Sequence, residues 1–312
     1  MSNPTPIIPL LDEAHARLRD DAADAPEIVA SLARALRVLK RNQSPETWEI
    51  TIEQCRSHTL REVLHEDPLT ERAFRKPRGY QGDGELLDII YERDWRTICD
   101  RHVTTLGEAI FSYTINCKAP AAVRIRRDML AGMIDETCER TNAPHILSVA
   151  CGHLREANQS AALRAGRVGR FVGLDQDPHS IELVERELSR YGVEPLRGSI
   201  KLLLAGPLAT QTFDFIYAAG LYDYLEDRLS QRLTERMFQM LRPGGRLLIA
   251  NYLPDIDDVG YMETYMGWRL IYRDADAMTR LASGIQRPSV ATQRTFHDPS
   301  DTIVFLQLDR DV

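Results

Sequence analysis

The 312-residue chain has an ordinary globular composition, with 43% hydrophobic and 27% charged residues. This length allows two domains, or one α/β domain with a large extension. The formal net charge is −7, and basic residues are interspersed with acidic ones, as at 124–128, which argues against a nucleic-acid-binding protein with one concentrated basic face. No apolar run approaches about 18 residues, so no membrane-spanning helix is predicted.

The pattern over residues 1–143 predicts a helical region. Four segments place apolar residues at the 3.6-residue spacing of an amphipathic helix. These segments are 26–39, 59–64, 85–98 and 120–138. Asp83 precedes the third segment, and we expect its carboxylate to cap that helix by accepting a hydrogen bond from a backbone N–H of the first turn.

From Pro144 onward, short apolar segments alternate with helical ones. Five strands are expected, at 146–150, 170–175, 193–197, 213–218 and 245–251, and a hairpin of two more at 291–296 and 302–308. Strands that alternate with helices indicate βαβ units and a parallel sheet. The sequence therefore predicts a helical cap over 1–143 and a Rossmann-like α/β domain over 144–312, with a seven-stranded sheet that ends in an antiparallel hairpin.

Ligands of open α/β sheets bind beyond the carboxyl ends of the strands, so the residues that follow each strand are candidate ligand contacts. Ala150, Cys151 and Gly152 follow the first strand and are small enough for a ligand to approach the backbone. Asp175 ends the second strand, where a carboxylate can bridge the two hydroxyls of a ribose. Gln176 follows it and is expected to reach the ribose or the edge of an adenine.

The third and fourth strands end in residues that suit a nucleoside. Ser199 and Ile200 offer a hydroxyl and an apolar wall for a purine, and Ala219 and Gly220 again present bare backbone. The full GxGxxG fingerprint of a dinucleotide site is absent, and no GxxxxGK[ST] segment occurs. The pattern favours a nucleoside that carries no phosphate.

Two resemblances follow from these segments. LRPGGRL at 241–247 is similar to the segment before the fifth strand in class I S-adenosylmethionine methyltransferases. RKPRGYQGD at 75–83, SVACG at 148–152 and GLYDYL at 220–225 together resemble the bacterial group of extracellular-factor (3-hydroxypalmitic acid methyl ester) biosynthesis proteins. The first resemblance implies the class I fold with S-adenosylmethionine as cofactor, and the second implies a carboxylate acceptor. Many members of that group have Gly-Pro where this chain has Gly152-His153.

The segment 75–83 is the most informative part of the N-terminal region, and its composition predicts an ordered loop. Arg75 and Arg78 are candidates to clamp the methionine carboxylate of the cofactor, or alternatively a substrate acid. Tyr80 lies between two glycines, and its ring suits a sulfonium while its hydroxyl suits an amino or carboxylate group. The alternative is a structural loop that ties the cap to the α/β domain.

Further candidates follow the fourth and fifth strands. Tyr222 and Tyr224 are expected near the mouth of the site, and Asn251 is expected to hold the substrate or the cofactor amino group. Tyr80, Tyr222 and Asn251 are the predicted catalytic residues. Tyr217 is expected to pack in the core, and His153 to be a solvated residue at a helix start.

Methyl transfer to a small-molecule acceptor, in secondary metabolism or signalling, is the favoured function, with the helical region as a lid over the acceptor. The alternative is attack by the cofactor's own amine on the γ-carbon of its aminocarboxypropyl arm, which releases methylthioadenosine and forms azetidine-2-carboxylate, as in azetidine-2-carboxylate synthases. A third hypothesis, from another class, is a cofactor-sensing pseudoenzyme.

The remaining features concern partners and compartment. Five scattered cysteines without a CxxC pair, and no secretory signal, predict free thiols in a cytoplasmic protein. The histidines form no ligand pattern, so no metal is predicted. The expected partner is a small-molecule substrate, with neither nucleic acid nor membrane, and the oligomeric state stays open.

Overall fold

A computed structural model describes residues 7–96 and 102–312 of the chain. These residues divide into two units, one that takes the chain up to Val123 together with Asp255–Arg269, and one that comprises Arg124–Pro254 and Leu270–Val312. The division differs from the predicted boundary between residues 143 and 144 in two ways. It falls inside a long helix, and the segment Asp255–Arg269 returns to the first unit, which no sequence pattern had indicated.

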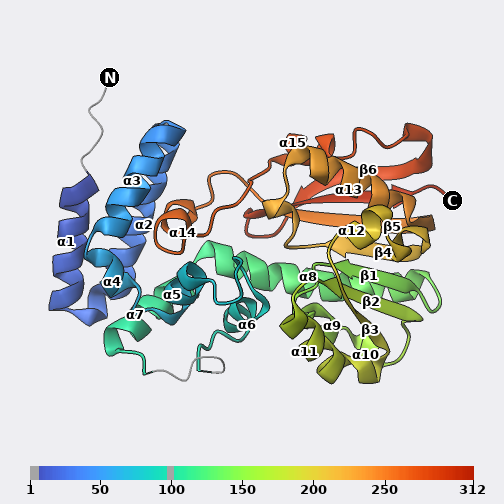
Figure 1. Cartoon of the computed structure of the whole chain (residues 1–312), viewed down its shortest axis with the longest axis horizontal. Helices are drawn as coiled ribbons and strands as arrows, with labels where there is room; N and C mark the ends of the chain where they lie inside the picture. The colour runs from blue at the N-terminus through green and yellow to red at the C-terminus, as the bar shows by residue number, and fades with distance from the viewer. Residues whose placement is uncertain (1–6, 97–101) are drawn as a thin grey trace. The chain divides into compact units, whose positions relative to one another are not determined.

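The first unit is helical (Figure 1). Its helices are α1 (Ile7–Asp20), α2 (Ala25–Asn42), α3 (Pro45–Ser57), α4 (Leu60–Leu64), α5 (Pro68–Arg75), α6 (Gly84–Glu92), α7 (Thr105–Thr114) and α14 (Val259–Thr264), and α8 (Lys118–Arg140) begins in it and continues into the second unit. The expected helices at 26–39, 59–64 and 120–138 are thereby confirmed, within a few residues at their ends.

Local capping explains where α6 begins and ends. Asp83 accepts a hydrogen bond from the backbone N–H of Leu86 at 2.9 Å, which confirms the predicted N-cap. The helix ends at Glu92 because Arg93 takes a left-handed conformation with φ 54°. The predicted extension of this helix to residue 98 is therefore wrong, and positions 97 and 98 lie outside the described residues.

The segment Asp255–Arg269 is held in the helical unit by a buried carboxylate. Glu263 accepts hydrogen bonds from the Lys40 ammonium and from the Trp48 indole N–H, both at 2.7 Å. The Arg56 guanidinium donates to the carbonyls of Glu263 and Thr264 at 2.8 and 2.9 Å. Because α14 also packs on α2, this segment is part of the core of the unit (Figure 1).

The second unit contains a seven-stranded sheet in the order β3-β2-β1-β4-β5-β7-β6 (Figure 1). The strands are β1 (His145–Val149), β2 (Arg170–Asp175), β3 (Val193–Arg197), β4 (Phe213–Ala218), β5 (Leu241–Tyr252), β6 (Val290–His297) and β7 (Ile303–Arg310). β1 to β5 are parallel, and β7 runs antiparallel to both β5 and β6. The predicted seven-stranded class I fold with its terminal hairpin is confirmed; β5 begins at Leu241, four residues before its expected start.

Helices cover the sheet because its central strands are apolar on both faces. The helices of this unit are α9 (Arg155–Gln159), α10 (Ala161–Arg164), α11 (Pro178–Leu188), α12 (Lys201–Ala205), α13 (Asp227–Gln239) and α15 (Ala275–Arg280). One core cluster joins residues of α12, α13 and α15 to β1, β2, β4, β5 and β7. The sheet order reverses direction at β1, between β2 and β4, which places the ligand crevice of such folds beyond the ends of these strands.

We expect Glu263→Ala to lower the free energy of unfolding of the protein by about 3 kcal/mol, because it removes an acceptor from the half-buried Lys40 ammonium and from the buried Trp48 indole N–H. The measurement is denaturant unfolding followed by circular dichroism. Glu53→Ala, which removes an exposed carboxylate from α3, is the matched control. Equal losses in the two variants would contradict the anchoring role of Glu263.

Candidate functional site

The carboxylate of Asp175 joins the ends of β1 and β2. One of its oxygens accepts the backbone N–H of Gly152 at 2.8 Å, and the other accepts that of Asp177 at 2.9 Å. Its residue is 8% exposed, and burial raises the pKa of the carboxyl above its ordinary value, although the two backbone hydrogen bonds oppose the shift. Each carboxylate oxygen keeps a lone pair for a further donor. Asp175 is thus oriented, and able to accept two hydroxyl groups from a ligand.

The backbone that follows β1 adopts an uncommon conformation. Ala150, Gly152 and Leu154 all have positive φ, at 55°, 53° and 52°. For a residue with a Cβ this conformation costs about 1–2 kcal/mol, and such strain is typical of functional turns. A Cβ at residue 152 would meet nothing within 4 Å, so the space beside this residue is open, and the positive φ favours glycine there.

A backbone hydrogen bond joins the ends of β2 and β3. The backbone N–H of Gly198 donates to the carbonyl of Asp175 at 2.8 Å, and a Cβ at residue 198 would lie 2.2 Å from Leu202 Cδ1. Ser199 and Ile200 follow and are half-buried, whereas Gln176 is exposed. The predicted nucleoside-binding residues of the α/β unit therefore meet at one edge of the sheet. They are Ala150, Cys151, Gly152, Asp175, Gln176, Ser199, Ile200, Ala219 and Gly220.

A buried arginine that the sequence analysis missed lies at the end of β4. Arg126, on α8, donates a hydrogen bond to the carbonyl of Ala219, and its Nη2 would be 3.8 Å from a Cβ at residue 220. In the sequence, 124–128 is a run of interspersed charges, but in the structure Arg124 and Arg126 are only 8% and 6% exposed. The sequence weakly indicates this burial, because both arginines are interspersed with the apolar positions of a predicted helix.

The positive charge of Arg126 affects the pKa of two buried carboxyl groups, those of Glu156 and Asp223. The Glu156 carboxylate accepts a hydrogen bond from the Tyr217 hydroxyl at 2.7 Å, and Asp223 accepts one from the backbone N–H of Tyr252 at 2.8 Å. Burial raises the pKa of Glu156 and raises that of Asp223 to about 6, while Arg126 opposes both shifts. Tyr217 is buried, as predicted.

Tyr222 does not lie where the sequence predicts it, whereas Asn251 lies at the end of β5, as expected. Tyr222 is fully buried in the core cluster, with its hydroxyl 2.8 Å from that of Thr234, so its predicted place at the mouth is wrong. The Asn251 amide donates to the carbonyl of Ile271 and accepts from Arg273, both at 2.8 Å. These contacts give both side chains a structural role. Their catalytic role is untested and stays a prediction.

Two other expectations concern exposure. His153 is 3% exposed, so the prediction of a solvated histidine is wrong. It lies in the turn after β1 that contains the left-handed Gly152 and Leu154, and the course of this turn carries the side chain inward. Tyr224 is 39% exposed.

Within the helical unit, the loop at 75–83 is held by ion pairs. Arg78 pairs with Glu85 at 2.6 Å, and the Gln81 amide donates to the carbonyl of Gly267 at 2.7 Å. Arg75, with a side chain 74% exposed, pairs with Glu71 at 2.8 Å. The loop is ordered, as predicted, and these contacts favour its structural alternative. The cofactor-binding roles of Arg75, Arg78 and Tyr80 stay predictions.

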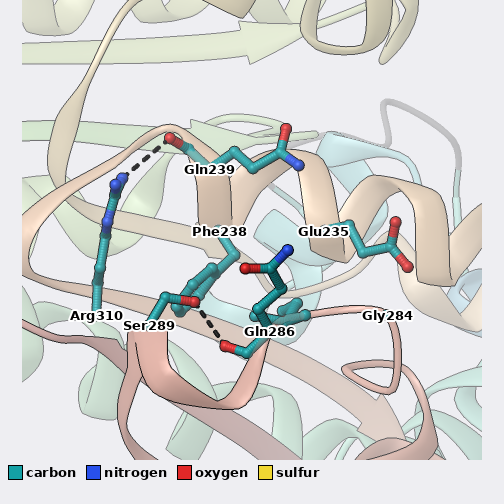
Figure 2. Close-up of a pocket in the computed structure, with 8 residues that line it drawn as sticks. Glu235, Phe238, Gln239, Gly284, Gln286, Ser289 and Arg310 are labelled. Carbon is teal, nitrogen blue, oxygen red and sulfur yellow. Dashed lines mark hydrogen bonds between the residues drawn. The ribbon is translucent and has the colours of Figure 1, made fainter.

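A cavity of about 290 Å³ lies elsewhere in the α/β unit, between α13, residues 284–289 and the end of β7 (Figure 2). Arg310, at its rim, donates to the carbonyl of Gln239 at 3.2 Å, and the Ser289 hydroxyl donates to that of Gln286 at 2.6 Å (Figure 2). Because β7 is antiparallel to β5, Arg310 lies toward the amino ends of the parallel strands. The cavity is therefore at the edge opposite Asp175.

Within the described ranges, Cys55, Cys117, Cys138 and Cys151 are free thiols, and Cys99 lies outside them. No group of three His, Cys, Asp or Glu side chains is arranged to hold a metal ion in this part of the chain. Among the described helices, none combines the length and apolarity that spanning a membrane requires.

Residues 146–245, which lie in the α/β unit, match the methyltransferase domain family. The chain carries a methyltransferase domain. This domain is of the class I, S-adenosylmethionine-dependent type, which confirms the predicted enzyme class and cofactor. The match includes Asp175 and the turn after β1. Its anchored carboxylate and open Gly152 backbone fit a nucleoside cofactor.

Solved structures support the fold. A protein from Bordetella parapertussis, described as a possible exported protein, has a TM-score of 0.63 at 16% identity, over 94% of this chain and 97% of that one. The CMeT domain of the citrinin polyketide synthase has a TM-score of 0.50 at 16% identity, over 73% of this chain and 59% of that one. No curated protein matches the chain in sequence.

We expect Asp175→Asn to weaken binding of S-adenosylhomocysteine by about 1–3 kcal/mol, because a neutral amide replaces a charged acceptor of ribose hydroxyls. Titration calorimetry measures this. Asp276→Asn, at an exposed position of α15, is the control and should bind normally. Unchanged affinity in a folded Asp175→Asn protein would remove this residue from the ribose site.

The pKa of Asp223 predicts a pH-dependent stability difference. Because the folded state raises this pKa from 3.8 to about 6, folding takes up protons between these values, and the stability contributed by protonated Asp223 is lost as pH rises through about 6. Asp223→Asn lacks this loss. Its stability relative to the wild type should therefore increase between about pH 4 and pH 6 and stay constant above. Urea unfolding of both proteins across this range measures it, and a pH-independent difference would contradict it.

Proposed function

We propose that the protein transfers a methyl group from S-adenosylmethionine to a small-molecule acceptor, of which a carboxylic acid is the favoured class, in secondary metabolism or signalling. The single observation that carries the proposal is the Asp175 carboxylate, which is held at the end of β2 by the backbone N–H groups of Gly152 and Asp177. The resemblance of 75–83, 148–152 and 220–225 to the methyl-ester biosynthesis group supports the acceptor class.

The residues of this edge would act mainly by binding and orientation. Asp175 accepts the ribose hydroxyls, Ser199 and Ile200 border the adenine, and the bare backbone of Gly152 and Gly220 permits close approach. When bound, the cofactor supplies a methyl group on a positively charged sulfur. A carboxylate acceptor is already a nucleophile, so in-line displacement requires no strong base from the protein. Holding the reacting atoms in line and excluding water can contribute several kcal/mol.

For the helical unit we propose the role expected from sequence, a cap that provides acceptor specificity. The segment RKPRGYQGD supports it, because this loop is ordered by Arg78–Glu85 and by Gln81 and still presents a half-buried tyrosine, Tyr80. A small-molecule substrate, with neither nucleic acid nor membrane as partner, and a cytoplasmic location complete the proposal.

The test is to incubate the protein with S-adenosylmethionine, first alone and then with 3-hydroxypalmitic acid and shorter carboxylic acids, and to identify the nucleoside product by mass spectrometry. We expect S-adenosylhomocysteine to form only when an acceptor is present. Methylthioadenosine formed without any acceptor would overturn methyl transfer in favour of cyclisation. Tight binding of the cofactor without either product would favour a sensing role. Asp175→Asn is the matched variant, and it should lower any turnover that depends on this site.

A further inference from the structure

Two cationic side chains of the helical unit lie over Gly267, and a third cation follows in sequence. They are Arg56 on α3, Lys76 directly after α5, and Arg269. A Cβ at residue 267 would lie 3.6 Å from Arg56 Nη2 and 3.8 Å from Lys76 Nζ. The Gln81 amide donates to the Gly267 carbonyl at 2.7 Å, which fixes the loop at 75–83 against this segment. Residues from three separate stretches of the chain thus bring positive charge to one place.

These cations repel one another. Burial lowers the pKa of Lys76, and the charges of Arg56 and Arg269 lower it further. Burial and the charge of Arg269 lower the pKa of Arg56 as well. The carboxylates of Glu53 and Glu49 oppose that second shift. The fold therefore disfavours the positive charge of Arg56 and Lys76, an arrangement that is typical of sites where an anion binds.

Within the described ranges, only Arg269 has an acid bonded to it. It donates to both carboxylate oxygens of Glu49, at 2.8 and 2.7 Å. Arg56 donates through Nε and Nη2 to backbone carbonyls, and its Nη1 makes no hydrogen bond to a described residue. The Lys76 ammonium forms neither a hydrogen bond nor an ion pair in this part of the chain. Two cations therefore keep free donors beside the same glycine.

We infer that Arg56, Lys76 and Arg269 form a binding site for a phosphate group. A phosphate monoester carries a charge of about −1.5 to −2 at neutral pH and has three acceptor oxygens. It can balance two cations that come from different elements, whereas a carboxylate balances one. The planar guanidinium of Arg56 suits the oxygens of a phosphate, and the Lys76 ammonium adds a compact charge with three donors.

This site goes beyond the proposed methyl transfer, because all its residues belong to the helical unit and none contacts the edge of the sheet where Asp175 lies. It gives the segment RKPRGYQGD a function through Lys76, although its neighbours Arg75 and Arg78 are paired with Glu71 and Glu85.

The test is equilibrium dialysis of the full chain against radiolabelled inorganic phosphate, at about pH 7.5 and constant ionic strength. We expect one saturable site per chain, for which the dianion sulfate competes and the monoanion acetate does not. Lys76→Gln should weaken phosphate binding by about 10-fold or more, because it removes one of the two free cations. Dialysis against ethyl phosphate distinguishes the sources of the group. Tighter binding than that of inorganic phosphate identifies an ester as the ligand, and weaker binding identifies the free ion.

Two further variants sharpen the test. Arg75→Gln is the matched control, because it removes the adjacent positive charge from an exposed side chain that pairs with Glu71, and phosphate affinity should stay within about twofold. Glu49→Gln acts in the opposite direction. It frees the Arg269 guanidinium from its carboxylate, so it should tighten phosphate binding by about two- to fivefold.

Equal phosphate affinity in the wild type and in Lys76→Gln would overturn the inference, and so would competition by acetate at the concentration at which sulfate competes. Thermal unfolding in phosphate-free buffer separates binding from structure. Because folding lowers the pKa of Lys76, its charge opposes folding, and Lys76→Gln should be as stable as the wild type or more stable. A large loss of stability in this variant would show a structural role for Lys76 and contradict the phosphate site.

Discussion

The bonds of the Asp175 carboxylate are the constraint on which the candidate site depends. This side chain accepts the backbone N–H of Gly152, which follows β1, and that of Asp177, which precedes α11, while its own carbonyl accepts from Gly198 after β3. Three consecutive turns are thus fixed around one buried acid. Burial raises the pKa of this carboxyl group, and the hydrogen bonds from backbone N–H groups partly oppose the rise. A carboxylate held in this way is oriented before any ligand arrives, which lowers the entropic cost of binding.

The same edge of the sheet shows how burial separates structural from functional polar groups. Asn251 has donors and acceptors engaged by Ile271 and Arg273, and Tyr222 is surrounded by the core that α13 completes. Arg126 contrasts with them, because it is buried and charged yet lies beside an exposed glycine. A polar residue near a strand end is therefore a poor guide to catalysis until its partners and its access to ligand are known.

The helical unit depends on a different interaction, the anchoring of Asp255–Arg269. Glu263 brings Lys40 and Trp48 to this segment, and Arg56 binds its backbone. Because the segment follows β5 in the chain, the two units are connected covalently after residues 123, 254 and 269. Neither unit is one continuous stretch of sequence. A truncation at residue 143 or 144 would therefore separate the later part of α8 from the α/β unit to which it belongs, and it would leave the helical core without α14.

The sequence by itself determined the class I sheet, because buried parallel strands are continuous apolar runs and the helices between them follow the 3.6-residue period. It also indicated Asp175 and Gly152, since the fold places strand ends at the ligand. Only the tertiary structure decided which distant residues share an environment: Glu263 with Lys40, and Arg126 with Ala219. Periodicity reports which face of an element is apolar, but a buried charge breaks that pattern, and its partner lies on another element about which local sequence carries no information.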